Sequence, residues 1–157
     1  MHDIKGRTWM IHLRSAARLC FATTILAGSL SAQEAAVVAQ NAWARPPAAS
    51  RNMTGMFVVL ENHSGEKRSV VGGSSDVAEK VELHEMKNEG GMMRMSPVSR
   101  IDIPANGKTE LKPGGLHIML FGLKGKHVEG DTFSVTLKLD NGETVPVKAT
   151  FRQPPVQ

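Results

Sequence analysis

The sequence predicts an all-β domain, folded as an antiparallel sandwich or barrel, and three observations support this. Short runs rich in β-branched and aromatic residues recur along the chain, and clusters of Gly, Pro, Asn and Asp separate them. The segment Asp140-Asn141-Gly142, between TFSVTLKL and TVPVKATF, is a strong hairpin signal. Many short strands at regular spacing are typical of an antiparallel sandwich.

Nine strands are expected, and their ranges in chain order are 42–45, 55–61, 69–72, 80–86, 92–98, 109–111, 116–120, 132–139 and 144–151. Residues that adopt tight or left-handed turns separate them, chiefly at 62–65, 88–91, 104–107, 113–115 and 140–142. Only residues 75–80 suggest a helical turn. The chain shows no internal repeat, so a single domain is expected.

Residues 1–32 have the order of a secretory signal peptide. A basic segment is followed by the apolar run LCFATTILAGSL and by a small-residue cleavage site near Ala32. The apolar run is about half of the roughly 20 residues that a membrane-spanning helix needs. We therefore expect a periplasmic protein that is not stably inserted in the membrane after cleavage, with a short leader at 33–41 and a folded domain at 42–157.

Charge and cysteine content exclude several classes of function. Residues 1–32 hold four of the 19 Lys and Arg residues and one of the 15 Asp and Glu residues, so the exported part has a net charge of +1. A basic stripe interleaved with aromatic residues is absent from the sequence, which argues against nucleic-acid binding. The only cysteine is Cys20, inside the expected signal. The exported part therefore has no disulfide, no thiolate nucleophile and no thiolate-bound zinc or blue-copper centre.

The stretch VELHEMKNEGGMMRM combines one histidine with four methionines around a Gly-Gly turn signal. If its arms pair through a two-residue turn at Glu89-Gly90, His84 lies opposite Met95 and Met86 lies opposite Met93. Residues two apart on a strand share a face, so all four side chains project from one side of the hairpin. Directly opposite residues have Cβ atoms roughly 5 Å apart, close enough for an imidazole and a thioether to share a metal ion.

A second His–Met pair follows in PGGLHIML, where His117 and Met119 are two apart on an expected strand and share a face. Ile118 and Leu120 then point into the core. Two imidazoles and two thioethers suit a soft metal, because thioether sulfur favours Cu(I) and imidazole binds copper in either oxidation state. Carboxylates are not clustered with them, which argues against Mg, Ca or Mn.

The four residues follow the pattern H-x10-M-x21-H-x-M, which resembles the periplasmic copper chaperones of the PCuAC type. AWAR at 42–45, VELHE at 81–85 and PGGLHIML at 113–120 agree with that family, and the resemblance covers residues 42–151. It implies a cupredoxin-like Greek-key β-sandwich that holds one Cu(I) per chain. The implied ligands are His84, Met95, His117 and Met119, with Met86 and Met93 as possible auxiliary ligands.

The resemblance also implies a function. The protein is expected to be a monomeric carrier, not an enzyme, that passes copper to a cuproprotein acceptor. That acceptor is the copper domain of cytochrome c oxidase or a thiol-bearing assembly factor. Some relatives carry a His- and Met-rich C-terminal tail for a second copper; this chain ends FRQPPVQ, so one site is expected.

Other interpretations remain open at this stage. The fold could serve as a metal-free interaction module, or copper could be stored or detoxified rather than delivered. Each candidate ligand taken singly is more typical of packing or of a solvated face, since methionine is a common core filler. Met92 and Trp43 are expected in the core, and Met53 and Met56 in packing or in an exposed loop. His63 and His127 are expected in solvent. A solvated charged face is expected for Asp76, Glu79, Glu82 and Glu85.

Overall fold

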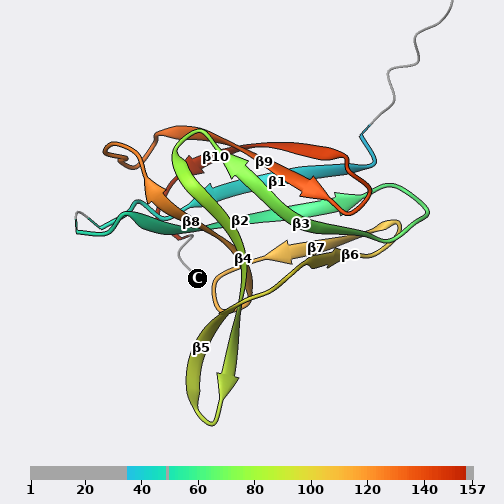
Figure 1. The fold of residues 1–157 in the computed structure, drawn as a ribbon, viewed down its shortest axis with the longest axis horizontal. Coiled ribbons are helices and arrows are strands. Elements are labelled where there is room, and N and C mark those ends of the chain that lie inside the picture. Colours follow the sequence, from blue (N-terminus) through green and yellow to red (C-terminus); the bar gives the residue numbers. More distant parts are fainter. Residues whose placement is uncertain (1–34, 49, 155–157) are drawn as a thin grey trace, which may run out of the picture. The chain divides into compact units, whose positions relative to one another are not determined.

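The computed structural model describes residues 35–48 and 50–154 (Figure 1). The expected signal peptide and its cleavage site lie outside these residues. Every regular element in the described part is a strand, and the strands are β1 Val37–Ala44, β2 Met53–Asn62, β3 Arg68–Ser75, β4 Ala78–Glu89, β5 Met92–Pro97, β6 Ile101–Ile103, β7 Gly107–Leu111, β8 Leu116–Leu123, β9 Thr132–Leu139 and β10 Thr144–Phe151. Among these residues no helix is long and apolar enough to cross a membrane.

The strands form one hydrogen-bonded network in the order β5-β4-β8-β2-β1-β10-β9-β3-β6. Strand β2 is shared, because its first half pairs with β8 and its second half with β7. All neighbours are antiparallel except β1 and β10, which run parallel through Trp43 and Ala44. The non-sequential order brings strands from opposite ends of the chain together, so most pairings are long-range.

One continuous apolar core lies inside this folded sheet and takes residues from nine of the ten strands; β5 contributes none. The largest fully buried side chains include Phe151, Met56, Leu60, Ile118 and Leu120. Met56 therefore fills the core, whereas Met53 is partly exposed at 38%. The alternation of apolar and polar residues along each strand is the pattern that predicted the sandwich.

The nine expected strands are all present, and β9 and β10 have the expected bounds. Three expectations need correction. Strand β1 begins at Val37, so the end of the expected leader already belongs to the sheet. Strand β6 was not expected, because three residues give too short a pattern to recognise. The expected helical turn at 75–80 is wrong: β3 runs to Ser75 and β4 begins at Ala78.

The β4–β5 hairpin projects away from the rest of the sheet (Figure 1). All six residues of β5 are exposed, because no second layer covers either of its faces. Met92 was expected in the core from its parity, and this is wrong: its side chain is 60% exposed. Parity assigns a face of a strand, but only a packed layer can bury that face.

Strand β8 anchors two of the candidate ligands through its inner face. Ile118 and Leu120 are fully buried in the core, and His117 and Met119 alternate with them on the other face. The core therefore fixes the orientation of the imidazole and the thioether, because rotating β8 would expose both apolar side chains.

Replacing Ile118 with Ala should lower the free energy of unfolding by about 2–5 kcal/mol, because it leaves a cavity in the core. Urea denaturation of the metal-free protein measures this loss. The control Val128→Ala, at a side chain that is 63% exposed, should stay within about 0.5 kcal/mol of wild type. Equal effects of the two changes would show that β8 is not anchored as described.

Candidate metal centre

The turn of the β4–β5 hairpin lies at Gly90 and Gly91 rather than at Glu89-Gly90. Both glycines have positive φ angles, 62° and 88°, as the central residues of a two-residue hairpin turn of type I′ require. Glu89 instead ends β4 and pairs with Met92. A side chain at either central position would strain the backbone, which explains why the turn takes both glycines.

This turn shifts the pairing by two residues from the expected register. Met86 lies directly opposite Met95, and His84 lies opposite Pro97. The expected pairs His84–Met95 and Met86–Met93 are therefore wrong. Because the shift is an even number, the side chains keep their face, and Met93 projects from the same side of the hairpin as the other three.

The neighbouring strand β8 supplies the partner that His84 lacks within the hairpin. His117 lies directly opposite His84, and the centroids of the two rings are 5.9 Å apart. On the other side of β8, Gly55 of β2 pairs with Met119. A Cβ placed on Gly55 would lie 3.8 Å from Met119 Sδ and 3.9 Å from His117 Cδ2, so a larger residue would fill the space over both.

The orientation of His117 leaves one ring nitrogen free to bind a metal. Its Nδ1 lies 2.9 Å from the carbonyl oxygen of Gly115, which only accepts, so Nδ1 carries the proton when the ring is neutral. Its Nε2 then holds a lone pair and lies 3.2 Å from Met95 Sδ. A backbone carbonyl that fixes the tautomer of a histidine in this way is typical of metal sites.

His84 is held in the opposite tautomer by a carboxylate. Its Nε2 lies 2.8 Å from Glu82 Oε2, and its Nδ1 is buried without a hydrogen-bond partner among the described residues. The hydrogen bond from Lys80, followed by that from His84, lowers the pKa of Glu82 below its ordinary value. Glu82 therefore stays ionised and accepts the Nε2 proton, which leaves the lone pair on the buried Nδ1.

Glu82 was expected on a solvated charged face, and its contact with His84 corrects that expectation. The sequence held a signal for it, because Glu82 and His84 are two apart on one strand and so share a face. No comparable signal existed for Gly55, whose position depends on the pairing of β2 with β8.

Met86, Met95, His117 and Met119 line one hollow of about 200 Å³, together with Gly55 and Phe57. His84 abuts this group through His117 and does not itself line the hollow. His84, His117 and Met119 are buried, at 6–7% exposure, whereas Met95 is 46% exposed. The structure therefore places three candidate ligands in a protected position and leaves one thioether open to solvent.

The donors gathered here are neutral nitrogen and sulfur atoms. Among residues 35–48 and 50–154, no cluster of three or more His, Cys, Asp or Glu side chains is arranged to hold a metal ion. A site for a hard cation or for zinc would require such a cluster. The arrangement in the hollow fits a soft, low-charge ion instead.

The other two histidines in the described part of the chain, His63 and His127, lie away from the hollow. His63 is exposed, as expected, and its Nε2 lies 3.9 Å from Glu61 Oε2. His127 was expected in solvent, and this is wrong: it is half-buried and stacks on Phe151, with ring centroids 4.9 Å apart. Trp43 is buried as expected, but it packs on Phe57 beside the hollow rather than within the apolar core.

Sequence comparisons connect the chain to putative lipoproteins. The family model described as putative lipoprotein LpqE-like matches residues 37–151. The chain is 38% identical over 112 residues to the putative lipoprotein Lxx21020 of Leifsonia xyli, covering 71% of this chain and 66% of that protein. It is 32% identical over 118 residues to the uncharacterized protein RP573 of Rickettsia prowazekii, with 69% and 62% covered. The chain thus spans just under two thirds of the length of these curated relatives.

Solved structures with the same fold include copper-binding domains. The copper-bound PCuAC domain from PmoF2 superimposes with a TM-score of 0.64 at 18% identity, covering 76% of this chain and 95% of that domain. CuI-DR1885 from Deinococcus radiodurans gives a TM-score of 0.63 at 32% identity, covering 82% and 87%. The apo form of DR1885 gives 0.59 at 29% identity, covering 98% and 97%. The cupredoxin-like sandwich and the resemblance to PCuAC proteins, both expected from the sequence, are confirmed.

The two fixed tautomers can be tested by NMR on the metal-free protein. At about pH 8, where an ordinary histidine is neutral, two-bond ¹H–¹⁵N spectra should show His117 protonated at Nδ1 and His84 at Nε2. Replacing Glu82 with Ala should abolish the preference at His84 and leave that at His117 unchanged. The exposed His63 serves as the control. A His117 ring protonated at Nε2 would contradict the proposed lone pair.

Proposed function

Because this chain belongs to the LpqE-like family of putative lipoproteins and folds as PCuAC domains do, we propose that it is a copper chaperone. It binds one Cu(I) through His84, Met95, His117 and Met119. The observation that carries the proposal is the short approach of the free His117 Nε2 to Met95 Sδ, 3.2 Å, in a hollow that Met119 also lines. Copper is the cargo in this proposal and not a resident cofactor of a reaction.

The chemistry of the donors supports Cu(I) as the metal. Two imidazoles and two thioethers bring no negative charge, so a monovalent ion can enter without leaving a large uncompensated charge. Among the described residues, the carboxylate that hydrogen-bonds a proposed ligand is that of Glu82, which accepts from His84 Nε2 and so holds the ring. A thioether also resists the disulfide formation that would disable a thiol in an oxidising compartment.

The gradient of exposure across the site supports release by ligand exchange. Met95 is the open ligand and projects from the hairpin, whereas both histidines are buried. An incoming thiolate or imidazole would reach the copper from the side of Met95. Met95 would leave first because it is exposed and binds weakly, and the histidines would leave last. Only copper–ligand bonds are exchanged in these steps and no covalent bond of either protein changes, so the proposed role is that of a carrier rather than an enzyme.

Two further thioethers extend the site along the hairpin. Met86 is half-buried, lines the hollow and lies directly opposite Met95, so it is placed to replace Met95 as a ligand. Met93 lies one step further out on the same face and is 52% exposed. We assign Met86 the role of a reserve ligand and Met93 that of an outer contact for arriving or departing copper.

Export and delivery complete the proposal. Residues 1–32 direct the protein to the periplasm, and the description of its relatives as putative lipoproteins supports an exported family. The proposed acceptor is the copper domain of cytochrome c oxidase or a thiol-bearing assembly factor, which the monomeric carrier meets there. Storage or detoxification requires the same ligands, so movement of copper to an apo acceptor domain is the decisive observation.

Loss of any one ligand should weaken Cu(I) binding by more than about tenfold, which corresponds to about 1.4 kcal/mol. His84→Ala and Met119→Leu are suitable changes, and competition with a Cu(I) chelator measures both the affinity and the ratio of one copper per chain. The control Met92→Leu removes an exposed thioether from the opposite face of the hairpin and should bind as wild type does. Wild-type affinity in either ligand variant would count against the ligand assignment, and absence of Cu(I) binding in the wild-type protein would favour a metal-free interaction module.

Replacing Met93 with Leu should slow the transfer of Cu(I) to a thiol acceptor severalfold while leaving the equilibrium affinity unchanged, because Met93 contacts copper only in passage. Stopped-flow kinetics measure the rate of transfer. Met92→Leu also removes one thioether, but from the opposite face, so comparing the two variants separates the effect of position from that of losing a thioether. Equal rates of Cu(I) transfer for the two variants would show that Met93 does not contact copper during transfer.

A further inference from the structure

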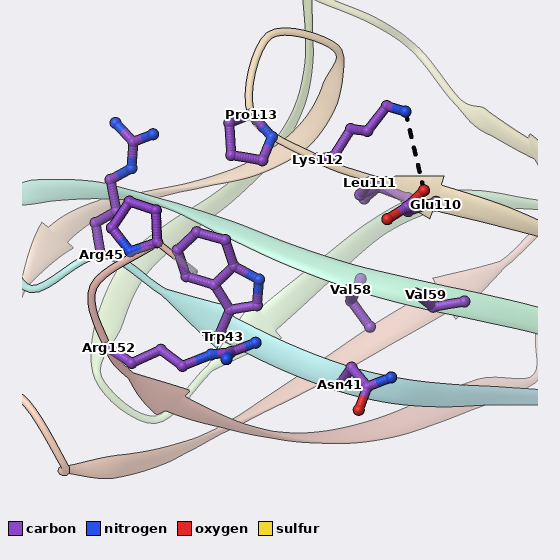
Figure 2. Close-up of a pocket in the computed structure, with 11 residues that line it drawn as sticks. Asn41, Trp43, Arg45, Val58, Val59, Glu110, Leu111, Lys112, Pro113 and Arg152 are labelled. Carbon is purple, nitrogen blue, oxygen red and sulfur yellow. Dashed lines mark ion pairs between the residues drawn. The ribbon is translucent and has the colours of Figure 1, made fainter. Parts of the chain in front are cut away.

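A second and larger hollow, of about 560 Å³, adjoins the metal centre (Figure 2). Trp43 lines it, with Lys112 and Arg152 among the residues around the indole. Arg45 and Pro113 line both this groove and the hollow that holds the methionines. Anything seated in the groove would therefore lie beside the hollow that contains the candidate ligands.

An irregularity in the pairing of β1 lies next to Trp43, which lines the groove. The pairing of β1 with β2 shifts register between Gln40 and Trp43, and Asn41 there has a positive φ of 54°. Such bulges re-aim the side chains that follow them. Here the indole of Trp43 packs on Phe57, with ring centroids 4.6 Å apart, on the face that also carries His117.

The groove is rich in positive charge. The guanidinium of Arg152 lies 5.1 Å from the centre of the Trp43 ring, and that of Arg45 lies 5.9 Å from the centre of the Phe57 ring. Within the described ranges neither guanidinium forms an ion pair, whereas nine pairs join other residues there, one of them in this groove. Lys112 is loosely paired, with Nζ 3.9 Å from Glu110 Oε2 (Figure 2).

Two exposed guanidinium groups resting on aromatic rings, without acidic partners, form a receptor for carboxylates. Arginine can bond a carboxylate through two parallel N–H donors, and stacking on a ring pre-orients the group. Buried tryptophan and arginine side chains are also the residues that contribute most to binding at protein interfaces. Charge complementarity thus identifies the occupant as an acidic surface.

We propose that this groove docks an acidic surface of the protein that accepts the copper. Carboxylates of the acceptor pair with Arg45 and Arg152, which line the groove beside the edge of Trp43. This docking holds the metal-binding groups of the acceptor beside Met95, so that ligand exchange becomes an intramolecular event. The inference rests on the proposed carrier function and adds the means by which the carrier recognises its acceptor.

Transfer kinetics test the docking. In Arg152→Glu, transfer of Cu(I) to the apo copper domain of cytochrome c oxidase should be about tenfold slower at low ionic strength, and the difference should shrink at high salt. Transfer to uncharged dithiothreitol should be unchanged. The matched control is Lys138→Glu on β9, which reverses the same charge at an exposed residue outside the groove. Wild-type transfer by Arg152→Glu, or equal slowing in the control, would overturn the proposal.

A second measurement needs no copper and so separates the docking from the carrier function. The indole N–H signal of Trp43 should shift when the metal-free protein is titrated with the same apo domain, and Arg152→Glu should abolish the shift. If the chelator titration shows no copper binding while this shift persists, the carrier function fails and the docking stands. If copper binds but the signal does not move, the docking proposal fails and the carrier function stands.

Discussion

The alternation of side chains along β4 and β8 is the constraint on which the site depends. Each strand turns one row of apolar residues into the core, and the same geometry turns the histidines and methionines outward. Ile118 and Leu120 are fully buried, so β8 cannot rotate without exposing them to water. The energy that holds the site in place is therefore hydrophobic, although none of the proposed ligands belongs to the apolar core.

Hydrogen bonds from outside the donor set decide which nitrogen of each proposed histidine ligand carries a lone pair. A backbone carbonyl holds one imidazole and a carboxylate holds the other, each in a fixed tautomer. In the proposed function, rings that are oriented before binding lower the entropy lost when copper binds. Met95 is the exposed member of the proposed set, which in that function makes it the ligand that an acceptor reaches first.

The groove beside the candidate metal centre is lined by residues of the same sheet. The bulge in β1 turns Trp43 towards Phe57, and Phe57 lies next to His117, with ring centroids 6.3 Å apart. The proposed docking groove and the proposed copper site thus lie on one continuous face. In the proposed function, Arg45 joins the two regions, because it lines both the groove and the hollow that contains the neutral donors.

The sequence by itself determined the all-β class, nearly every strand, and the shared face of His84, Met86, Met93 and Met95. Face sharing depends only on the two-residue period of a strand, so it survived a turn placed one residue further along, which shifts the pairing by two residues. The tertiary structure alone decided that His117 lies opposite His84, that Gly55 opens the space above Met119, and that a groove adjoins the site. These features depend on which distant strands become neighbours, and local patterns of residues do not encode that choice.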